Sequence, residues 1–592
     1  MQLKLHLLAA GTAAVVMLGA CVDDNYSLDD IDTTTRITVD NLTLPVNIDA
    51  VTLSDVITYD DDSRIKPISL GGNEFYALTE SGTFESEDIY IDRVTSNAPH
   101  LNDSHSWLPL LSEHPFGAKA AVDVPMKYVY HIDNLGNDFS YDSDDIDHAV
   151  DALYSAEVQP LTFSIDLRAL NIDDDADFMT FSNLKILMPK GLTATASHGT
   201  YDPETGIWAI DNYNVNGTRA FASLTATAID FVANGVKIIN HSMHFSSQFR
   251  LTEGYLIVEP KSVDGVLRQL PESLEFIVKY GLSDLEVNSL TGRINYKLKG
   301  MDIAPVSLSD IPDFLSDPET KLMLQNPQIY LKVNNPVADN RLDCRTGITL
   351  TANRPGSALP YSPDNGFFTI GYDKGEAGPY NFVLAPQQNG LTTPAEYADP
   401  SFVPFSTLGQ ILAGNDEVTG IPESIGIHLD DPEIPSQDVV DFRLGRTLPG
   451  AKGSYELIAP LALSAGSSVV YSDRETGWND DDVDAIVINK LAVRFTATNN
   501  SPLAVDLMAY PLDAEGKRLQ GLELATTATL QAGAQDQAME IVLTGGEVRH
   551  LDGIEYVARV HAGTDGTALQ PSQTIVLKNI RATVGGYYEK EL

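Results

Sequence analysis

The chain has 592 residues, 43% of them hydrophobic, and includes 20 Phe and 24 Tyr, so it is long and apolar enough for several folded domains. It carries 38 basic and 83 acidic side chains, which gives a formal net charge of −45. A surface this acidic repels nucleic acid and anionic lipid head groups, so we expect neither as a partner.

The chain begins with the sequence MQLKLHLLAAGTAAVVMLGAC. Lys4 gives the N-terminal region the positive charge that is typical of a signal peptide, and residues 7–18 form an apolar run of the length found in secretory signal peptides. This run is shorter than the roughly 20 residues of a membrane-spanning helix. The run ends in Leu-Gly-Ala before Cys21, which resembles the bacterial lipobox. That resemblance implies a signal peptide over 1–20 and a lipid anchor on Cys21. The alternative is an ordinary secretory signal peptide in which a cysteine happens to follow the cleavage site.

The residues after Cys21 are acidic, polar and turn-prone, and we expect 21–36 to be a flexible tether. Asp23 and Asp24 resemble the acidic export signal of Bacteroidota lipoproteins, which implies an outer-membrane protein that faces the cell exterior. If Cys21 is acylated, Cys344 has no partner for a disulfide. We therefore expect Cys344 to be a small, semi-buried apolar residue.

Alternation of apolar and polar residues, bounded by Gly, Pro, Asn or Asp, recurs along the chain. It predicts an all-β protein of tandem antiparallel β-sandwich (Ig-like) domains with a few short helices. The helical candidates are 262–270, 308–315 and 405–412. The clearest predicted strands lie within 35–48, 159–170, 182–189, 254–260, 274–282, 292–300, 327–335, 490–500 and 573–584.

Two stretches of the sequence are echoed later in the chain. Residues 264–276 and 408–427 each place Pro-Glu-Ser before a strand, and 329–338 and 493–504 each run from a strand into Asn-Asn and Pro, with Asn335 and Asn500 lying 165 apart. Asn tolerates left-handed backbone, and Pro ends a strand ladder. This repeat predicts two related modules. The alternative is a chance similarity between the Asn and Pro residues that end many β-strands. We expect an N-terminal β-rich region over 37–255, a middle module over 256–398 and a C-terminal module over 399–592.

Two family resemblances accompany these segments. The strand–Asn–Pro segments resemble the Ig-like domains of late-embryogenesis-abundant proteins. The acidic tether, the TLPVNID segment and the YSDRETGWNDDDVD segment around Trp478 resemble large, uncharacterised surface lipoproteins of Bacteroidota. The resemblance to Bacteroidota surface lipoproteins implies a location at the cell surface and a fold, but it implies no activity.

Acidic turns at 141–147, 172–177 and 479–484 place several carboxylates close together, as hard cations require. None fits the calcium loop with its closing Glu, and solvated turns are the alternative. A zinc site from His100, His105 and His114 is a remoter option, and we expect His241 and His244 to lie on opposite faces of a strand. The calcium candidates are Asp173, Asp175, Asp177, Asp480, Asp482 and Asp484.

Three tryptophans, Trp107, Trp208 and Trp478, stand beside turn residues. An exposed indole there could stack on a sugar ring, and a buried one would plug the end of a sandwich. Standard hydrolase, zinc-protease, dithiol, P-loop and dinucleotide-binding motifs are missing from the sequence.

These observations favour a non-enzymatic surface lipoprotein that displays β-sandwich domains for binding or adhesion, or as an accessory to an outer-membrane complex. The expected contacts are the membrane, through the lipid anchor, and a protein or glycan of unknown identity. No cofactor is expected, with calcium as the exception to test. The alternatives are a glycan-binding lipoprotein of a polysaccharide-uptake system, a fimbrial-type subunit trimmed at Arg36, and a glycoside hydrolase.

Overall fold

The computed structural model describes residues 34–591, with breaks at 45–50, 53–56, 58, 61–62, 71, 116–125, 173–175, 265, 309–310, 312–314, 316, 318, 374–377, 416–417, 419, 479–484, 527 and 563–565. Across these residues the regular elements are β-strands, with 3₁₀ turns such as η3 (Ala338–Asn340), η4 (Ala395–Tyr397) and η5 (Leu408–Gln410). The prediction of an all-β protein built from antiparallel sheets is confirmed. No helix among the described residues is long and apolar enough to span a membrane.

The helical candidates do not form α-helices where the structure describes them. Residues 262–270 instead contain a small hairpin of β17 (Ser262–Val263) and β18 (Val266–Leu267). The backbone of Asp264 is left-handed there, with φ of 53°, which a helix cannot accommodate. Within 405–412 only η5 forms, and 308–315 lies largely outside the described residues.

The chain forms two compact units, and each is assembled from distant parts of the sequence. Unit 1 comprises Met1–Val51, Val470–Val560 and Thr574–Leu592, and unit 2 comprises Thr52–Val469 and His561–Gln573. This division differs from the boundaries expected from the sequence. Strand β16 (Ser242–Pro260) runs through residue 256, and residue 399 lies inside unit 2.

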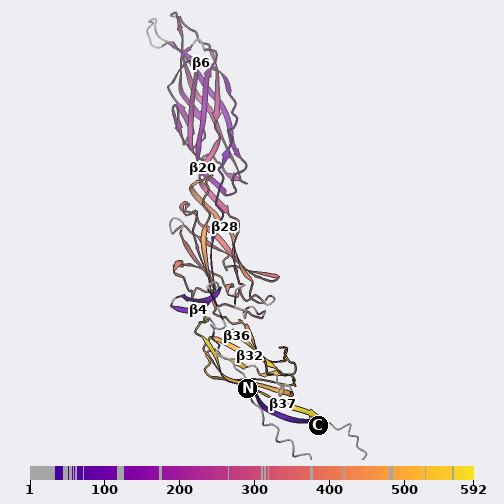
Figure 1. The fold of residues 1–592 in the computed structure, drawn as a ribbon. Helices are drawn as coiled ribbons and strands as arrows, with labels where there is room; N and C mark the ends of the chain where they lie inside the picture. Colours follow the sequence, from indigo (N-terminus) through magenta and orange to yellow (C-terminus); the bar gives the residue numbers. More distant parts are fainter. Residues whose placement is uncertain are drawn as a thin grey trace, which may run out of the picture. The chain divides into compact units, whose positions relative to one another are not determined.

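Unit 1 is a sandwich of two sheets whose inner side chains form one apolar core. Its first sheet includes the N-terminal strand β1 (Thr34–Leu44), which pairs antiparallel with the C-terminal strand β37 (Thr574–Glu591), so these two strands lie side by side in Figure 1. Leu491 and Val493 of the first sheet pack in the core with Ile554 of the second. The first sheet has the order β1, β37, β31 (Ile486–Asn499), β35 (Gln537–Thr544) and β33 (Glu523–Thr526); the second has the order β30 (Val469–Glu475), β36 (Gly553–Ala562), β32 (Leu503–Leu512) and β34 (Ala528–Leu530).

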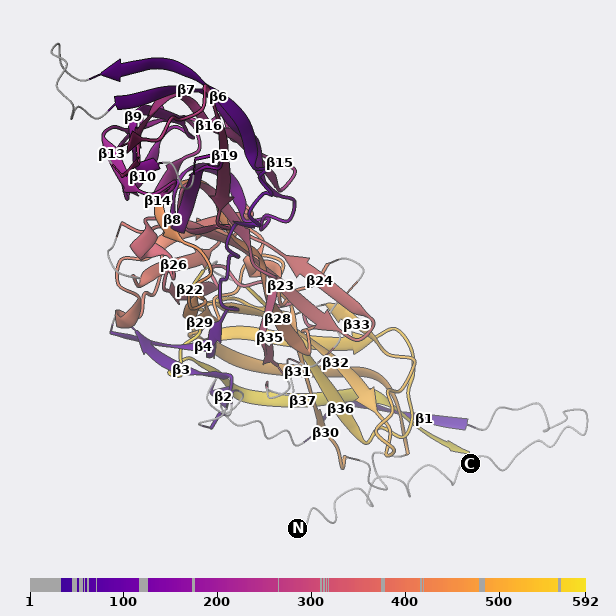
Figure 2. The ribbon, with the colours of Figure 1, turned by 90° about the horizontal axis from the view of Figure 1, so that it is seen from above.

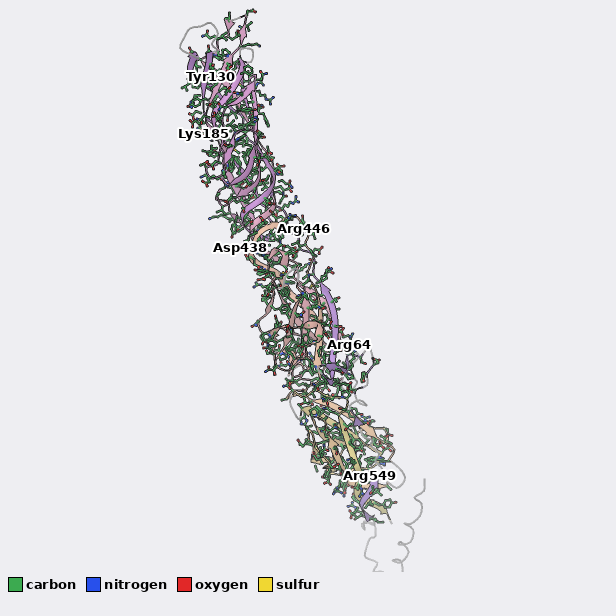
Figure 3. The ribbon with its side chains drawn as sticks, turned by 90° about the vertical axis from the view of Figure 1, so that its left-hand side faces the viewer. Arg64, Tyr130, Lys185, Asp438, Arg446 and Arg549 are labelled. Carbon is green, nitrogen blue, oxygen red and sulfur yellow. The ribbon has the colours of Figure 1, made fainter. Side chains whose placement is uncertain are left out.

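One part of unit 2 is a sandwich of long strands, which lie together in the indigo-to-magenta part of Figure 2. One layer contains β6 (Ser104–Pro115), β7 (Met126–Ser143), β16 and β9 (Ala176–Leu187). The other contains β14 (Arg219–Asp230), β8 (Val150–Ala169), β19 (Ser273–Leu282) and again β6, which passes from one layer to the other. Phe163, Phe181, Phe249 and Phe276 are fully buried between the layers. Tyr130 and Lys185, labelled in Figure 3, both belong to this sandwich.

A second set of strands in unit 2 is joined to this sandwich through two long strands. Strand β20 (Leu285–Lys297) pairs with β8 and with β28 (Ser424–Arg443), and β28 continues into the second set by pairing with β21 (Met301–Ser307) and β23 (Cys344–Arg354). A further sheet belongs to this part of unit 2. It has the order β27 (Ser401–Pro404), β26 (Tyr380–Ala385), β22 (Gln328–Val333), β29 (Lys452–Pro460), β4 (Asn73–Glu85) and β3 (Ile65–Leu70).

The echoed strand–Asn–Pro segments share one feature, once in each unit: a buried Asn side chain that accepts a hydrogen bond from the N–H two residues later. Asn335 follows β22, and Asn499 ends β31; both side chains are fully buried. The amide of Asn335 donates to Leu342 O at 2.7 Å and its oxygen accepts from the N–H of Val337 at 3.0 Å. Asn499 likewise accepts from the N–H of Ser501 at 3.0 Å, whereas its amide donates at 2.7 Å to Leu503 O, four residues later rather than seven. The structural counterpart of Asn335 is therefore Asn499, one position before the residue that the sequence alignment suggests.

Candidate ligand-binding face

The predicted anchor and calcium candidates cannot be placed by the structure. Cys21, Asp173, Asp175, Asp480, Asp482 and Asp484 lie outside the described residues, and for Asp177 only the backbone in β9 is described. In the described part of the chain, no three His, Cys, Asp or Glu side chains converge as metal ligands would.

The acidic turn at 141–147 is described, and its carboxylates bind groups of the protein. Asp142 accepts hydrogen bonds from Ser140 and His244, and Asp147 accepts from the N–H groups of Asp92 and Ala149. The hydrogen bonds from Ser140 and then His244 hold the pKa of Asp142 below its usual value. These carboxylates therefore order the turn itself.

The histidine candidates are spread over different contacts. His105 pairs with Glu275, with 2.8 Å between Nε2 and Oε1, whereas the side chain of His114 lies outside the described residues. His241 lies in a turn rather than a strand, and its ring centroid is 3.9 Å from that of His148. His241 and His244 thus have different partners.

Two of the three tryptophans are core residues. Trp208 is fully buried, and its indole N–H donates to His198 O at 2.7 Å. Trp478 is 6% exposed and packs in the core of unit 1. A buried ring presents no free face to a sugar, so neither can serve as a glycan-stacking residue in this structure. Trp107 is 56% exposed and remains the candidate.

Trp107 lies on the solvent-facing side of the four-strand layer formed by β14, β8, β19 and β6. We call this side the outer face. Side chains alternate along a strand, so those that flank each buried residue point outward. In β19, Leu274, Phe276 and Val278 are buried, which directs Glu275 and Ile277 to the outer face. The same alternation places Phe221 of β14 outward, where it is 56% exposed.

Two ion pairs and one histidine–carboxylate hydrogen bond cross the strands on the outer face. Arg219 donates to both carboxylate oxygens of Asp166, at 2.8 and 2.5 Å. His105 contacts Glu275, and Lys279 lies 3.4 Å from a carboxylate oxygen of Asp103. Arg168 of β8 is a further exposed cation on this face, so three basic side chains stand among three carboxylates there, in a chain that is strongly acidic overall.

The two exposed aromatic rings stand at opposite corners of the outer face. Starting from Phe221 on β14, the residue opposite it on β8 is Asp166, and the residue opposite Asp166 on β19 is Lys279. Four residues from Lys279 along β19 lies Glu275, which is opposite Trp107 on β6. Three strand spacings and four residues of rise place the two aromatic residues about 20 Å apart. By the same register, Arg168 of β8 and Ile277 of β19 lie between the two rings, and the paired side chains lie to either side.

Two interior features of unit 2 offer no comparable surface. Cys344 is mostly buried beside Asn335; burial, together with the charge of Asp343, raises the pKa of its thiol to about 12, so the thiol stays protonated and unreactive. An apolar void of about 20 Å³, lined by Ile329, Leu350, Ile425 and other side chains, has room for about one water molecule.

Sequence reasoning missed Phe221 and the pairing of His105 with Glu275. The signal for Phe221 was available, because Arg219, Phe221 and Ser223 share one parity along β14 while Ala220, Ala222 and Leu224 share the other. The pairing of His105 with Glu275 depends on the register of β6 against β19 across 170 residues, which no local pattern reveals.

Comparison with known proteins places the chain in no family. No family model and no curated protein matches it. Among solved structures, it is similar to a secreted-protein candidate from Parabacteroides distasonis ATCC 8503, with 16% identity, a TM-score of 0.34, and coverage of 50% of this chain and 90% of that one. A chain from the triple jelly roll fold and turret assembly of an archaeal virus matches at 10% identity and a TM-score of 0.11, over 83% of this chain and 91% of that one.

Proposed function

We propose that the protein is a non-enzymatic lipoprotein of the outer membrane that faces the cell exterior and binds a ligand through the outer face of β14, β8, β19 and β6. The observation that carries this proposal is the exposure of Trp107 and Phe221 on an ordered sheet. An exposed aromatic ring on a rigid strand has little freedom to lose on binding, so it contributes contact area at low entropic cost.

The chain's connectivity supports attachment through unit 1. Strand β1 begins 13 residues after Cys21 and is paired along β37 in unit 1. An acyl anchor on Cys21 would thus hold unit 1 through a short tether, and unit 2, which carries the outer face, would be attached through unit 1.

The fimbrial alternative requires cleavage at Arg36, and this residue is held in place. Arg36 lies inside β1, its guanidinium is 3.0 Å from a carboxylate oxygen of Glu589, and it lies 4.6 Å from the centre of the Tyr587 ring. Cleavage there would first require β1 to separate from β37, so we do not include trimming in the proposal.

Protease shaving of intact Bacteroidota cells that express the full chain with a C-terminal epitope tests the location. We expect extracellular protease to remove the epitope from wild-type cells, and Cys21→Ser to leave an unlipidated precursor that is absent from the outer membrane. Metabolic labelling with a clickable fatty acid provides the lipidation readout. An epitope that is degraded only after the cells are broken would contradict surface display.

A further inference from the structure

We propose that the outer face of β14, β8, β19 and β6 binds a neutral oligosaccharide, with Trp107 and Phe221 stacking on separate sugar rings. This inference rests on the proposed function, because it names the ligand class for the same face.

The aromatic rings supply the first part of the argument. The solvent side of an antiparallel sheet ordinarily carries polar side chains, yet two large rings stand on this one, each 56% exposed. A sugar ring has faces of C–H groups that carry slight positive charge, and an aromatic face carries the complementary negative charge. Flat stacking between the two removes apolar surface of both from water.

Local charge decides against other ligand classes. The basic side chains of Arg168, Arg219 and Lys279 on the outer face equal in number the carboxylates of Asp166, Glu275 and Asp103. The outer face therefore offers neither the surplus of cations that binds phosphates nor a surplus of acid. A protein partner would be expected to cover a contiguous apolar centre, whereas these two rings lie about 20 Å apart, with the charged Arg168 between them and paired charges on either side. A neutral ligand rich in hydroxyl groups fits this pattern.

The paired side chains also provide the polar contacts that a sugar needs. Each carboxylate has more acceptor sites than its partner side chain occupies, and the guanidinium of Arg219, which is 67% exposed, retains further N–H donors. Sugar hydroxyls donate and accept, so they can bind both members of a pair without leaving a charge unsatisfied. The spacing of the rings requires a ligand of several sugar units rather than a monosaccharide.

The experiment is native affinity electrophoresis of the full mature chain through gels that contain single polysaccharides. The neutral probes are dextran, amylopectin, galactomannan, arabinoxylan and laminarin; polygalacturonate and chondroitin sulfate are the acidic probes. We expect at least one neutral polysaccharide to retard the wild-type chain. Trp107→Ala should weaken that retardation at least ~10-fold, and Phe221→Ala should weaken it to a smaller extent.

Tyr471→Ala is the matched control, because Tyr471 is an aromatic residue of unit 1 that is 43% exposed, and it should bind like the wild type. His105→Gln and Glu275→Gln test the polar contacts, and unchanged thermal unfolding shows that each variant is folded. Retardation by acidic probes alone, by no probe, or equally with and without Trp107 would overturn the proposal. Surface display, which is measured separately by protease shaving, could still hold in any of those cases.

Discussion

At the scale of single residues, burial separates side chains that look alike in the sequence. Trp107 and Trp208 both stand beside turns, yet one is 56% exposed and the other is fully buried with its N–H bound to a carbonyl. Both lie in the first sandwich of unit 2. Substituting each tryptophan by alanine therefore compares, within one folded unit, a residue expected to stabilise the core with a residue expected to bind ligand.

Trp208→Ala should lower the free energy of unfolding of unit 2 by about 3–5 kcal/mol, because it leaves a large cavity and an unsatisfied carbonyl. Trp107→Ala should change it by no more than about 0.5 kcal/mol, as exposed substitutions do. Chemical denaturation followed by tyrosine and tryptophan fluorescence measures both. Equal destabilisation by the two substitutions would show that Trp107 is a structural residue.

Glu555 is a buried charged residue of unit 1, with 3% of its surface exposed. Burial raises the pKa of Glu555, but hydrogen bonds and charges from Arg518 and Arg474 outweigh that effect and hold the pKa below its usual value of 4.5. Because the pKa is lower in the folded state, the stabilisation is present above pH 4.5 and is lost as the pH falls through the folded-state pKa.

We therefore expect Glu555→Gln to lower the stability of unit 1 by about 1–3 kcal/mol at pH 7 and to have less effect at pH 3. Thermal unfolding between pH 3 and pH 7 measures the difference. Glu540→Gln is the matched control, because Glu540 also pairs with an arginine of unit 1 but is 46% exposed. An effect of Glu555→Gln that is the same at both ends of the pH range would contradict the assigned role of the carboxylate.

At the scale of elements, β1 completes unit 1 although it is separated from the rest of that unit by more than 400 residues. It pairs with β37 from Thr34 to Leu44, and Val39 and Leu42 pack against the core. Without β1, one edge of β37 would be left with unpaired backbone groups, which invites association with other chains.

Deletion of residues 34–44 should lower the melting temperature of unit 1 by more than ~5 °C and leave the transition of unit 2 unchanged, because about one kcal/mol shifts a unit of this size by several degrees. Differential scanning calorimetry resolves the two transitions. A deletion of residues 24–33 controls for the length of the tether. If the deletion of β1 left both transitions in place, β1 would be an accessory to unit 1 rather than part of it.

The positions of the strands along the chain could be predicted from local sequence, whereas the pairing of distant strands into sheets could not. The alternating segments at 159–170, 274–282 and 490–500 lie in β8, β19 and β31, because period-2 burial is a local property. The unit boundaries depend on pairings such as β1 with β37 and β4 with β29, which join strands hundreds of residues apart. The face that carries Trp107 likewise depends on register between distant strands, so sequence could nominate the residue but not its neighbours.

At the scale of the whole molecule, the proposed membrane anchor on Cys21 and the proposed ligand-binding face of unit 2 lie in different parts of the chain. The strongly negative net charge keeps such a protein soluble and away from anionic surfaces, while basic and acidic side chains are equal in number on the outer face. An uncharged glycan could therefore approach this face without opposition from the rest of the surface.

The most direct test is the capture of fluorescent neutral polysaccharide by intact cells that display either the wild-type chain or Trp107→Ala. Surface amounts are matched with an antibody against the C-terminal epitope, and binding is read by flow cytometry. The account predicts saturable labelling of wild-type cells, competition by the unlabelled polysaccharide, and labelling of Trp107→Ala cells close to that of cells without the protein. Equal labelling of cells displaying the two variants, at equal surface amounts, would contradict it.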